Sequence, residues 1–342
     1  FSGGLSRRQT IIRGAGVMFV TIAFILLGDI LATAGSFAPL VVLLALLGML
    51  ANLFGYRNLR ATRPGGAYVR VEASKGGILA FLTGWALMIS GLGLCALLAQ
   101  GFGVHVSVLL RNHLNLTLPV WPWAMGLVFI LAVNNALGTQ GSRRGVVTGF
   151  LVVIALVLSF VVLSAPRLKL ANYQSGISNW EQGFTLVIAA FVGLEITAGL
   201  QDEVRDRGRN PPTPLWVPSV LAAVAGTVIA TIVIGVLGPD LAMSAQEGRL
   251  HHLLLQLGTT VAGGAGRPFI LVVGAFGLAL ALNSAFVLVL RHIYAMGQDG
   301  YWPAALLSMD THFGTPMRAV FLMVLLMLPL LFVPLRDLSR WV

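Results

Sequence analysis

Nine long apolar segments dominate the sequence, and they decide what the chain can fold into. They lie near residues 13–33, 35–55, 77–101, 119–137, 145–165, 183–201, 215–238, 268–290 and 318–335. A run of about 20 apolar residues is long enough to cross the roughly 30 Å hydrocarbon layer of a bilayer as a helix. Membrane-spanning strands would instead give shorter segments in which apolar and polar residues alternate. The sequence therefore predicts an all-α, polytopic membrane protein that contacts the lipid bilayer.

The composition and the charge agree with this class of protein. Of the 342 residues, 57% are hydrophobic and only 10% are charged, whereas soluble domains carry roughly 25% charged residues. If the N-terminus is cytoplasmic and the nine segments alternate in direction, fifteen of the 22 Lys and Arg residues fall on the cytoplasmic side. The positive-inside rule describes this bias. We therefore expect a cytoplasmic N-terminus, a plasma (inner) membrane location and no nucleic-acid partner.

The start of the chain has a second interpretation. The stretch LSRRQTIIRGAGVMFV resembles a twin-arginine export signal, with Ala32-Thr33-Ala34 as its cleavage site. Cleavage would leave eight spans, and basic residues are ordinary ahead of a first span. We expect the first segment to be retained.

Two of the apolar segments carry a carboxylate beside glycines. Asp29 lies in LLGDILATAG, and Glu195 lies in FVGLEITAG. A charge at the centre of a bilayer costs about 3 kcal/mol on insertion scales, so an intramembrane acid indicates a functional site. The two acids lie in the first and the sixth segment, which are equivalent positions if the chain consists of two halves.

That equivalence predicts an inverted repeat. If five segments form one half, the sixth begins a second half of opposite direction, as in inverted-repeat transporters. We expect the first repeat over residues 1–165 and the second over residues 166–342. The first and sixth helices would then be broken near the midplane, where free backbone groups can bind a solute.

Three stretches resemble the amino acid, polyamine and organocation permease superfamily, in that family's order. RPGGAYVRVEASKGGILAFLTGWAL is similar to its third helix and the preceding loop, and AAFVGLEITAGLQDEVRDRGRNPPTP resembles its sixth helix. LNSAFVLVLRHIYAMGQDGYWPAALLSMDTHFGTPMRAV resembles its eighth helix and the loop into the ninth. The resemblance implies a LeuT-like inverted-repeat transporter fold of five plus five helices. About nine helices are expected here, so either this sequence is a fragment or the second repeat is incomplete at the C-terminus.

The resemblance also implies where a solute binds. The first and sixth helices would hold it through Val20, Thr21, Ile22, Ala23 and Phe24, and through Ala190, Phe191, Val192, Gly193 and Glu195. The family's first helix is broken at Gly-x-Gly-Ile-Phe, and this sequence has Val20 and Ile22 in place of the two glycines. Glycine gives an unwound segment its freedom, whereas Val and Ile are stiff and crowd the backbone.

Each polar residue at membrane depth has two interpretations. Glu195 is a gate, a proton sensor or the partner of a substrate amine, or it is a protonated acid bonded to a neighbouring helix, because burial favours the neutral form. Asp29 shares the gating and proton-coupling role or reaches interfacial water. Asn283 and Ser284 form an ion site with first-helix carbonyls, or they hydrogen-bond across helices.

These features predict a secondary-active permease for an amino acid or a small organic amine that works by alternating access. Exchange, uniport or protonation of Glu195 is the simplest mechanism, because the fifth segment contains no amine to replace sodium. The alternative is a non-transporting, permease-like subunit that scaffolds a partner protein, since the glycines and a tenth helix are missing. The histidines and the one cysteine, Cys95, show no catalytic or metal-ligand spacing, so we expect no enzyme activity, no metal and no cofactor. Besides the substrate, the partners left open are another protein or a second copy of the chain.

Overall fold

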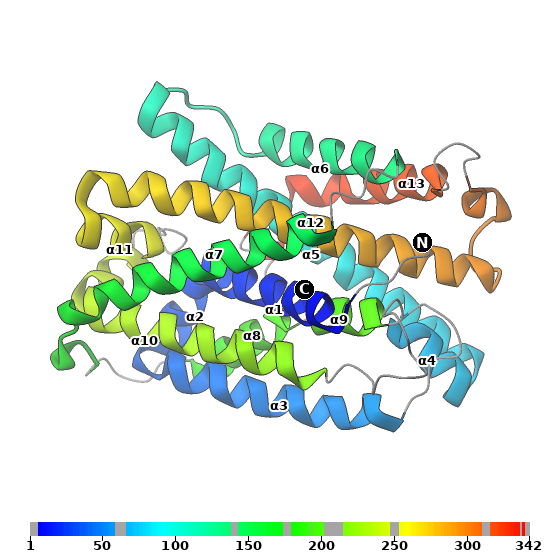
Figure 1. Ribbon diagram of the computed structural model, residues 1–342, viewed down its shortest axis with the longest axis horizontal. Coiled ribbons are helices and arrows are strands. Elements are labelled where there is room, and N and C mark those ends of the chain that lie inside the picture. The colour runs from blue at the N-terminus through cyan, green and yellow to red at the C-terminus, as the bar shows by residue number, and fades with distance from the viewer. Residues whose placement is uncertain are drawn as a thin grey trace.

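The long helices run alongside one another, roughly along the long axis of the molecule (Figure 1). The structure is a computed structural model that describes residues 6–58, 66–137, 143–173, 179–191, 193–201, 215–246, 253–309, 315–335 and 337–338. Within these ranges the regular elements are helices, and no strand occurs.

The described parts of all nine predicted segments are largely helical. The first contains α1 (Arg7–Thr21), the π-helical η1 (Ile22–Leu26) and α2 (Leu27–Ala34). The next four contain α3 (Ala38–Asn58), α5 (Gly77–Leu114), α6 (Trp121–Ala136) and α7 (Arg143–Ser164). The last four contain α8 (Trp180–Ala190) with α9 (Gly193–Gln201), then α10 (Trp216–Gln246), α12 (Gly266–Gln298) and α13 (Met317–Met327). Short helices α4 (Gly66–Lys75) and α11 (Leu253–Ala262) lie in two of the connections.

Six helical stretches in the described ranges are long and apolar enough to cross a membrane. One of them, Arg7–Ala51, contains the first two predicted spans, and Trp121–Ala136 and Met317–Phe332 are shorter apolar helices. The prediction of an all-α membrane protein is confirmed.

The two ends of the bundle differ in charge. Figure 1 shows α4 at one end of the molecule and α11 at the other. The end with α4, which we call the basic end, also holds the start of α1 and the end of α12. Among the described residues the basic end carries Arg7, Arg8, Arg70, Lys75, Arg144, Arg291 and Arg318. The opposite end carries Arg111, Arg167, Lys169 and Arg267.

The bundle is built around α5 and α12, which pack along each other. Small residues allow this approach, because a Cβ added at Gly91 of α5 would lie 2.6 Å from the side chain of Val289 on α12. Close packing at small residues is typical of membrane helices. Large apolar side chains on the periphery stay exposed, as Ile78 and Leu163 do, and lipid is the medium that suits such a surface.

The ninth segment is interrupted, and Gln100 of α5 compensates for the interruption. After α13 the chain forms a 3₁₀ turn, η8 (Pro329–Phe332), and then extends. The side-chain nitrogen of Gln100 donates to the carbonyls of Leu330 (3.1 Å), Leu331 (3.2 Å) and Val333 (2.5 Å). Irregular backbone at membrane depth is tolerated where the protein satisfies its polar groups.

The loop after α7 is fastened to α10 in a related way. This strap, residues 165–173, contains the 3₁₀ turns η3 (Ala165–Arg167) and η4 (Leu170–Tyr173). Residue 239 of α10 is a proline, which has no N–H, so the carbonyl of Gly235 lacks its usual helical donor. The Nδ2 of Asn172 (2.7 Å) and the N–H of Lys169 (3.0 Å) donate to that carbonyl instead.

We expect Asn172→Ala to lower the free energy of unfolding by about 1 kcal/mol, because the Gly235 carbonyl then keeps only one donor. Thermal or denaturant unfolding in detergent micelles measures this. Asn112→Ala, on the exposed end of α5, is the matched control and should stay within about 0.5 kcal/mol. Equal effects of the two substitutions would show that the strap contributes nothing to stability.

Candidate functional site

The first apolar helix changes its winding at the predicted site. Residues Ile22–Leu26 are π-helical, and the N–H of Ile22 contacts the carbonyls of Met18 and Phe19. The hydroxyl of Thr21 donates to the carbonyl of Val17 at 2.8 Å. A π-helical turn inside an α-helix is rare and is frequently found at functional sites. Here a change in hydrogen-bond register stands where the family has its glycine break, and the chain stays helical through residues 20–24.

The five residues predicted on this helix are buried and face different neighbours. Val20 lies against Gly277 of α12, and Ile22 lies against Gly226 of α10. Val20 and Ile22 therefore fill the space between helices.

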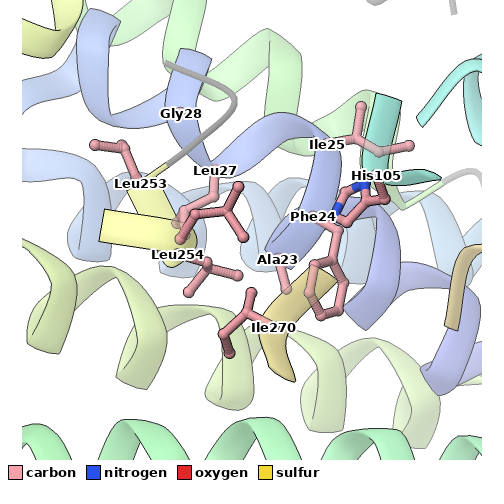
Figure 2. Close-up of a pocket in the computed structure, with 10 residues that line it drawn as sticks. Ala23, Phe24, Ile25, Leu27, Gly28, His105, Leu253, Leu254 and Ile270 are labelled. Atoms are coloured by element: carbon pink, nitrogen blue, oxygen red, sulfur yellow. The ribbon is translucent and has the colours of Figure 1, made fainter. Parts of the chain in front are cut away.

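Ala23 and Phe24 instead line a small hollow beside the π-helical segment, shown in Figure 2. Its atom-free space is about 290 Å³, part of it open to the outside, and about 10 Å³ is available to the centre of a water molecule. That is room for about one water molecule. Apart from one histidine, the wall is glycine and apolar side chains, and it consists of Ala23, Phe24, Ile25, Leu27, Gly28, His105, Leu253, Leu254, Leu255 and Ile270.

His105 is the one polar side chain in this wall. It comes from α5, is almost fully buried, and its Nδ1 lies 2.8 Å from the carbonyl of Gly101. A carbonyl only accepts, so Nδ1 carries the proton in this contact. The ring meets Phe24 edge to face, with 5.6 Å between ring centroids. Sequence reasoning missed His105, because the predicted third span ended at residue 101 whereas α5 continues to Leu114.

The sixth apolar helix is interrupted between α8 and α9. Phe191 has φ −75° and ψ 0°, which lies in the sparsely populated bridge region. Its N–H bonds back to Ile188 (2.9 Å), and its carbonyl accepts from the N–H of Leu194 (2.8 Å). Ala190 and Phe191 are buried, and Val192 lies outside the described residues.

Helix α9 lies against α1 through small residues. A Cβ at Gly193 would lie 2.7 Å from the Met18 side chain and 3.4 Å from the carbonyl of Gly14. Thr197, one turn further, is fully buried against Gly14. Gly193 and Thr197 are four residues apart and share the face of α9 that packs on α1.

Glu195 lies on another face of α9. It shares that face with Gly199, four residues on, and Gly199 packs against Leu288 of α12. The Glu195 residue is half-buried, and its Oε2 is buried. The acid is therefore on the side of α9 that is turned to α12.

The remaining predicted residues lie elsewhere in the bundle. Asp29 is half-buried in the first turn of α2, next to Gly28 of the hollow. Asn283 accepts from Asn135 of α6 at 3.4 Å, and the Ser284 hydroxyl donates to the carbonyl of Leu280 at 3.0 Å. Such bonds are common between and within membrane helices. The ion site at Asn283 and Ser284 stays a prediction.

We expect Gly193→Ala to destabilise the protein by about 1–3 kcal/mol, because the added methyl group would press on the backbone of α1. Gly126→Ala on α6 is the control, since a Cβ there meets nothing within 4 Å. Unfolding in detergent measures both. A Gly193→Ala protein as stable as the control would contradict the tight α1–α9 contact.

Comparisons with known proteins cover nearly the whole chain. Residues 5–339 match the amino acid permease family. The branched-chain amino acid permease BcaP of Bacillus subtilis is 24% identical over 330 residues, which cover 89% of this chain and 69% of that protein. The methylthioribose transporter of the same organism is 24% identical, with 93% and 72% covered. The vacuolar cationic amino acid transporter 2 of Arabidopsis thaliana is 24% identical, with 90% and 50% covered.

The matched residues include the π-helical first helix, the interrupted sixth helix, and helices α10 and α12, against which they pack. The chain belongs to the amino acid permease family.

Proposed function

We propose that the protein carries an amino acid or a small organic amine across the membrane by alternating access. The observation that carries the proposal is the pair of irregular helices, η1 in the first span and the interruption at Phe191 in the sixth, in a chain of the amino acid permease family. Non-helical or re-registered backbone at membrane depth is where transporters of inverted-repeat type bind their solutes.

The order of the elements supports two inverted repeats, residues 1–165 and 166–342. The short helix α4 precedes the long helix α5 at the basic end, and the short helix α11 precedes the long helix α12 at the opposite end. The two long helices pack along each other. A pair of equivalent units in opposite orientation would give this arrangement.

The distribution of charge supports an orientation. In the proposal the basic end faces the cytoplasm, which places the N-terminus inside and follows the positive-inside rule. The hollow between η1 and α11 then belongs to the outer half of the solute path. At the basic end, the contacts of α9 with α1 leave no room for a solute at Gly14, because a Cβ there would overlap the Thr197 side chain.

In the proposed mechanism, Glu195 exchanges a proton or pairs with a substrate amine as α9 moves relative to α12. Its position on the face of α9 turned to α12 supports this role. A carboxylate at membrane depth is stabilised only when a proton, a cation or hydrogen-bond donors accompany it. The movement of such a partner would then be linked to the movement of the helix.

The second candidate is a non-transporting, permease-like subunit that binds a partner protein. One observation favours it: Val20 and Ile22, which replace the family's glycines, are fully buried against neighbouring helices. Copurification with a fixed partner and the absence of solute binding would support this function.

We expect Glu195→Gln to lower the rate of substrate transport in proteoliposomes by about tenfold or more and to flatten its dependence on pH, because the amide cannot take up a proton. Glu181→Gln is the matched control, since Glu181 is an exposed acid in the first turn of α8. A tenfold change corresponds to about 1.4 kcal/mol. Unchanged transport and unchanged pH dependence would remove the role of Glu195.

We also expect one class among amino acids, polyamines and other small amines to raise the midpoint of thermal unfolding of the purified protein. A ligand that binds only the folded form at 100 times its Kd stabilises by about 2.7 kcal/mol. The screen uses each compound alone, with a sugar of similar size as the control. A flat response to every compound would favour the scaffold function.

A further inference from the structure

The hollow beside η1 starts at the irregular backbone of the first helix. It is lined by Ala23, Phe24 and Ile25 of η1, and by Leu27 and Gly28 at the start of α2. The rest of its wall comes from α5, α11 and α12. A solute that binds to backbone groups of η1 therefore has this hollow directly beside it, and the chemistry of the wall decides which part of the solute can enter.

The wall favours apolar groups over cations. None of the described residues that line the hollow is acidic. The nearest acid along the chain, Asp29, follows Gly28 but does not line the hollow. Burying a charge away from water is costly unless a partner of opposite charge goes with it. A cationic side chain or a polyamine therefore finds no counter-ion in this wall, whereas an aliphatic side chain is stabilised by contact with it.

His105, the one polar side chain in the wall, is held from three sides. Its Nδ1 donates to the carbonyl of Gly101 at 2.8 Å, and its ring meets the Phe24 ring edge to face. The third side is Gly274 of α12, where an added Cβ would lie 2.6 Å from Cδ2 and Nε2 of the imidazole and 2.8 Å from the Phe24 ring. The two rings therefore occupy a place that exists only because α12 has no side chain there.

These two rings form one end of the hollow. Figure 2 shows Phe24 and His105 together on one side, and Leu253 and Leu254 of α11 on the other. The imidazole is seated against the backbone of α12, so it moves less easily than a leucine side chain that can change its rotamer. The position of the rings therefore limits how long a side chain the hollow can accept.

We propose that the hollow is the subsite for the side chain of the solute and that it selects aliphatic amino acids over cationic amino acids and polyamines. His105 is a positioning residue, which with Phe24 ends the subsite against α12. The inference rests on the proposed function, because it assumes that the solute binds beside η1. In an apolar pocket one methylene group changes discrimination by about tenfold or more, so the length of the subsite matters as much as its polarity.

Equilibrium binding of radiolabelled L-leucine to the purified protein in detergent tests the polarity of the subsite. L-isoleucine, L-lysine and putrescine are the unlabelled competitors. We expect L-isoleucine to compete at least about tenfold more strongly than L-lysine or putrescine, because only its side chain fits the wall without a counter-ion. Absence of L-leucine binding, or equal competition by L-lysine, overturns the proposal.

Gly274→Ala tests the end of the subsite. The added methyl group should push the two rings into the hollow, so the affinity for L-leucine should fall by about tenfold and that for L-alanine by less than about twofold. Gly126→Ala is the matched control, because a Cβ there meets nothing within 4 Å. An equal loss of L-leucine and L-alanine binding overturns the role of this end.

His105→Ala should act in the opposite direction. Removal of the imidazole lengthens the subsite, so the affinity for L-phenylalanine relative to L-leucine should rise by about tenfold. His113→Ala is the matched control, since His113 is exposed in the last turn of α5. An unchanged ratio in His105→Ala overturns the positioning role of His105. The midpoint of thermal unfolding shows whether each variant is folded.

Uptake of the same compounds into proteoliposomes separates this inference from the proposed function. If L-leucine binds with the expected selectivity but is not transported, the subsite stands and the transport function is overturned. If L-lysine or putrescine is transported while L-leucine neither binds nor competes, the transport function stands and the subsite is overturned.

Discussion

Every backbone N–H and C=O group at membrane depth has to find a partner inside the protein, and the rest of this structure depends on that constraint. The chain departs from regular α-helix at several places, and two of these departures are closed by side chains from elsewhere in the sequence. Gln100 satisfies the carbonyls of η8, and Asn172 satisfies the Gly235 carbonyl that a proline leaves open. At these two places the backbone is held by hydrogen bonds from distant parts of the sequence, so it belongs to the rigid part of the bundle. In the π-helical segment and at Phe191 the bonds given to the irregular backbone come from the same apolar segment of the chain. These backbone bonds can therefore change register without breaking a hydrogen bond to another segment, and this distinguishes the candidate site from the two places closed by Gln100 and Asn172.

The sequence was sufficient to predict the helical class and the nine segments, because apolar length alone is a strong signal in a membrane protein. Helix ends were less predictable. The stretch after residue 101 contains glycine, histidine and arginine and looks like a loop, yet α5 continues to Leu114, and His105 was missed for that reason. The π-helical segment could not be predicted, since Val, Thr and Ile give no sign of hydrogen-bond register. Contacts such as Gly14 with Thr197 need two distant segments to be placed together, and one sequence does not provide that placement.

The hollow beside η1 limits how a solute could bind. With room for about one water molecule, it is too small for an amino acid in this closed form. In the proposed mechanism, a solute would therefore select a form in which α11 or the first helix has moved, and the cost of that movement would lower the apparent affinity. Buried Val20 and Ile22 raise this cost, because their side chains fill space that glycines would leave open. The packing of Val20 and Ile22 is also the observation that favours the scaffold function. In a transporter, this packing would couple solute binding strongly to the movement that opens the site.

Coupling of this kind requires a closed form that is only slightly favoured. A ligand can shift an equilibrium between two forms by no more than its difference in affinity for them, so a closed form held by extensive apolar packing would never open. In the proposed mechanism, binding of the solute therefore has to offset the packing of Val20 against Gly277 and of Ile22 against Gly226.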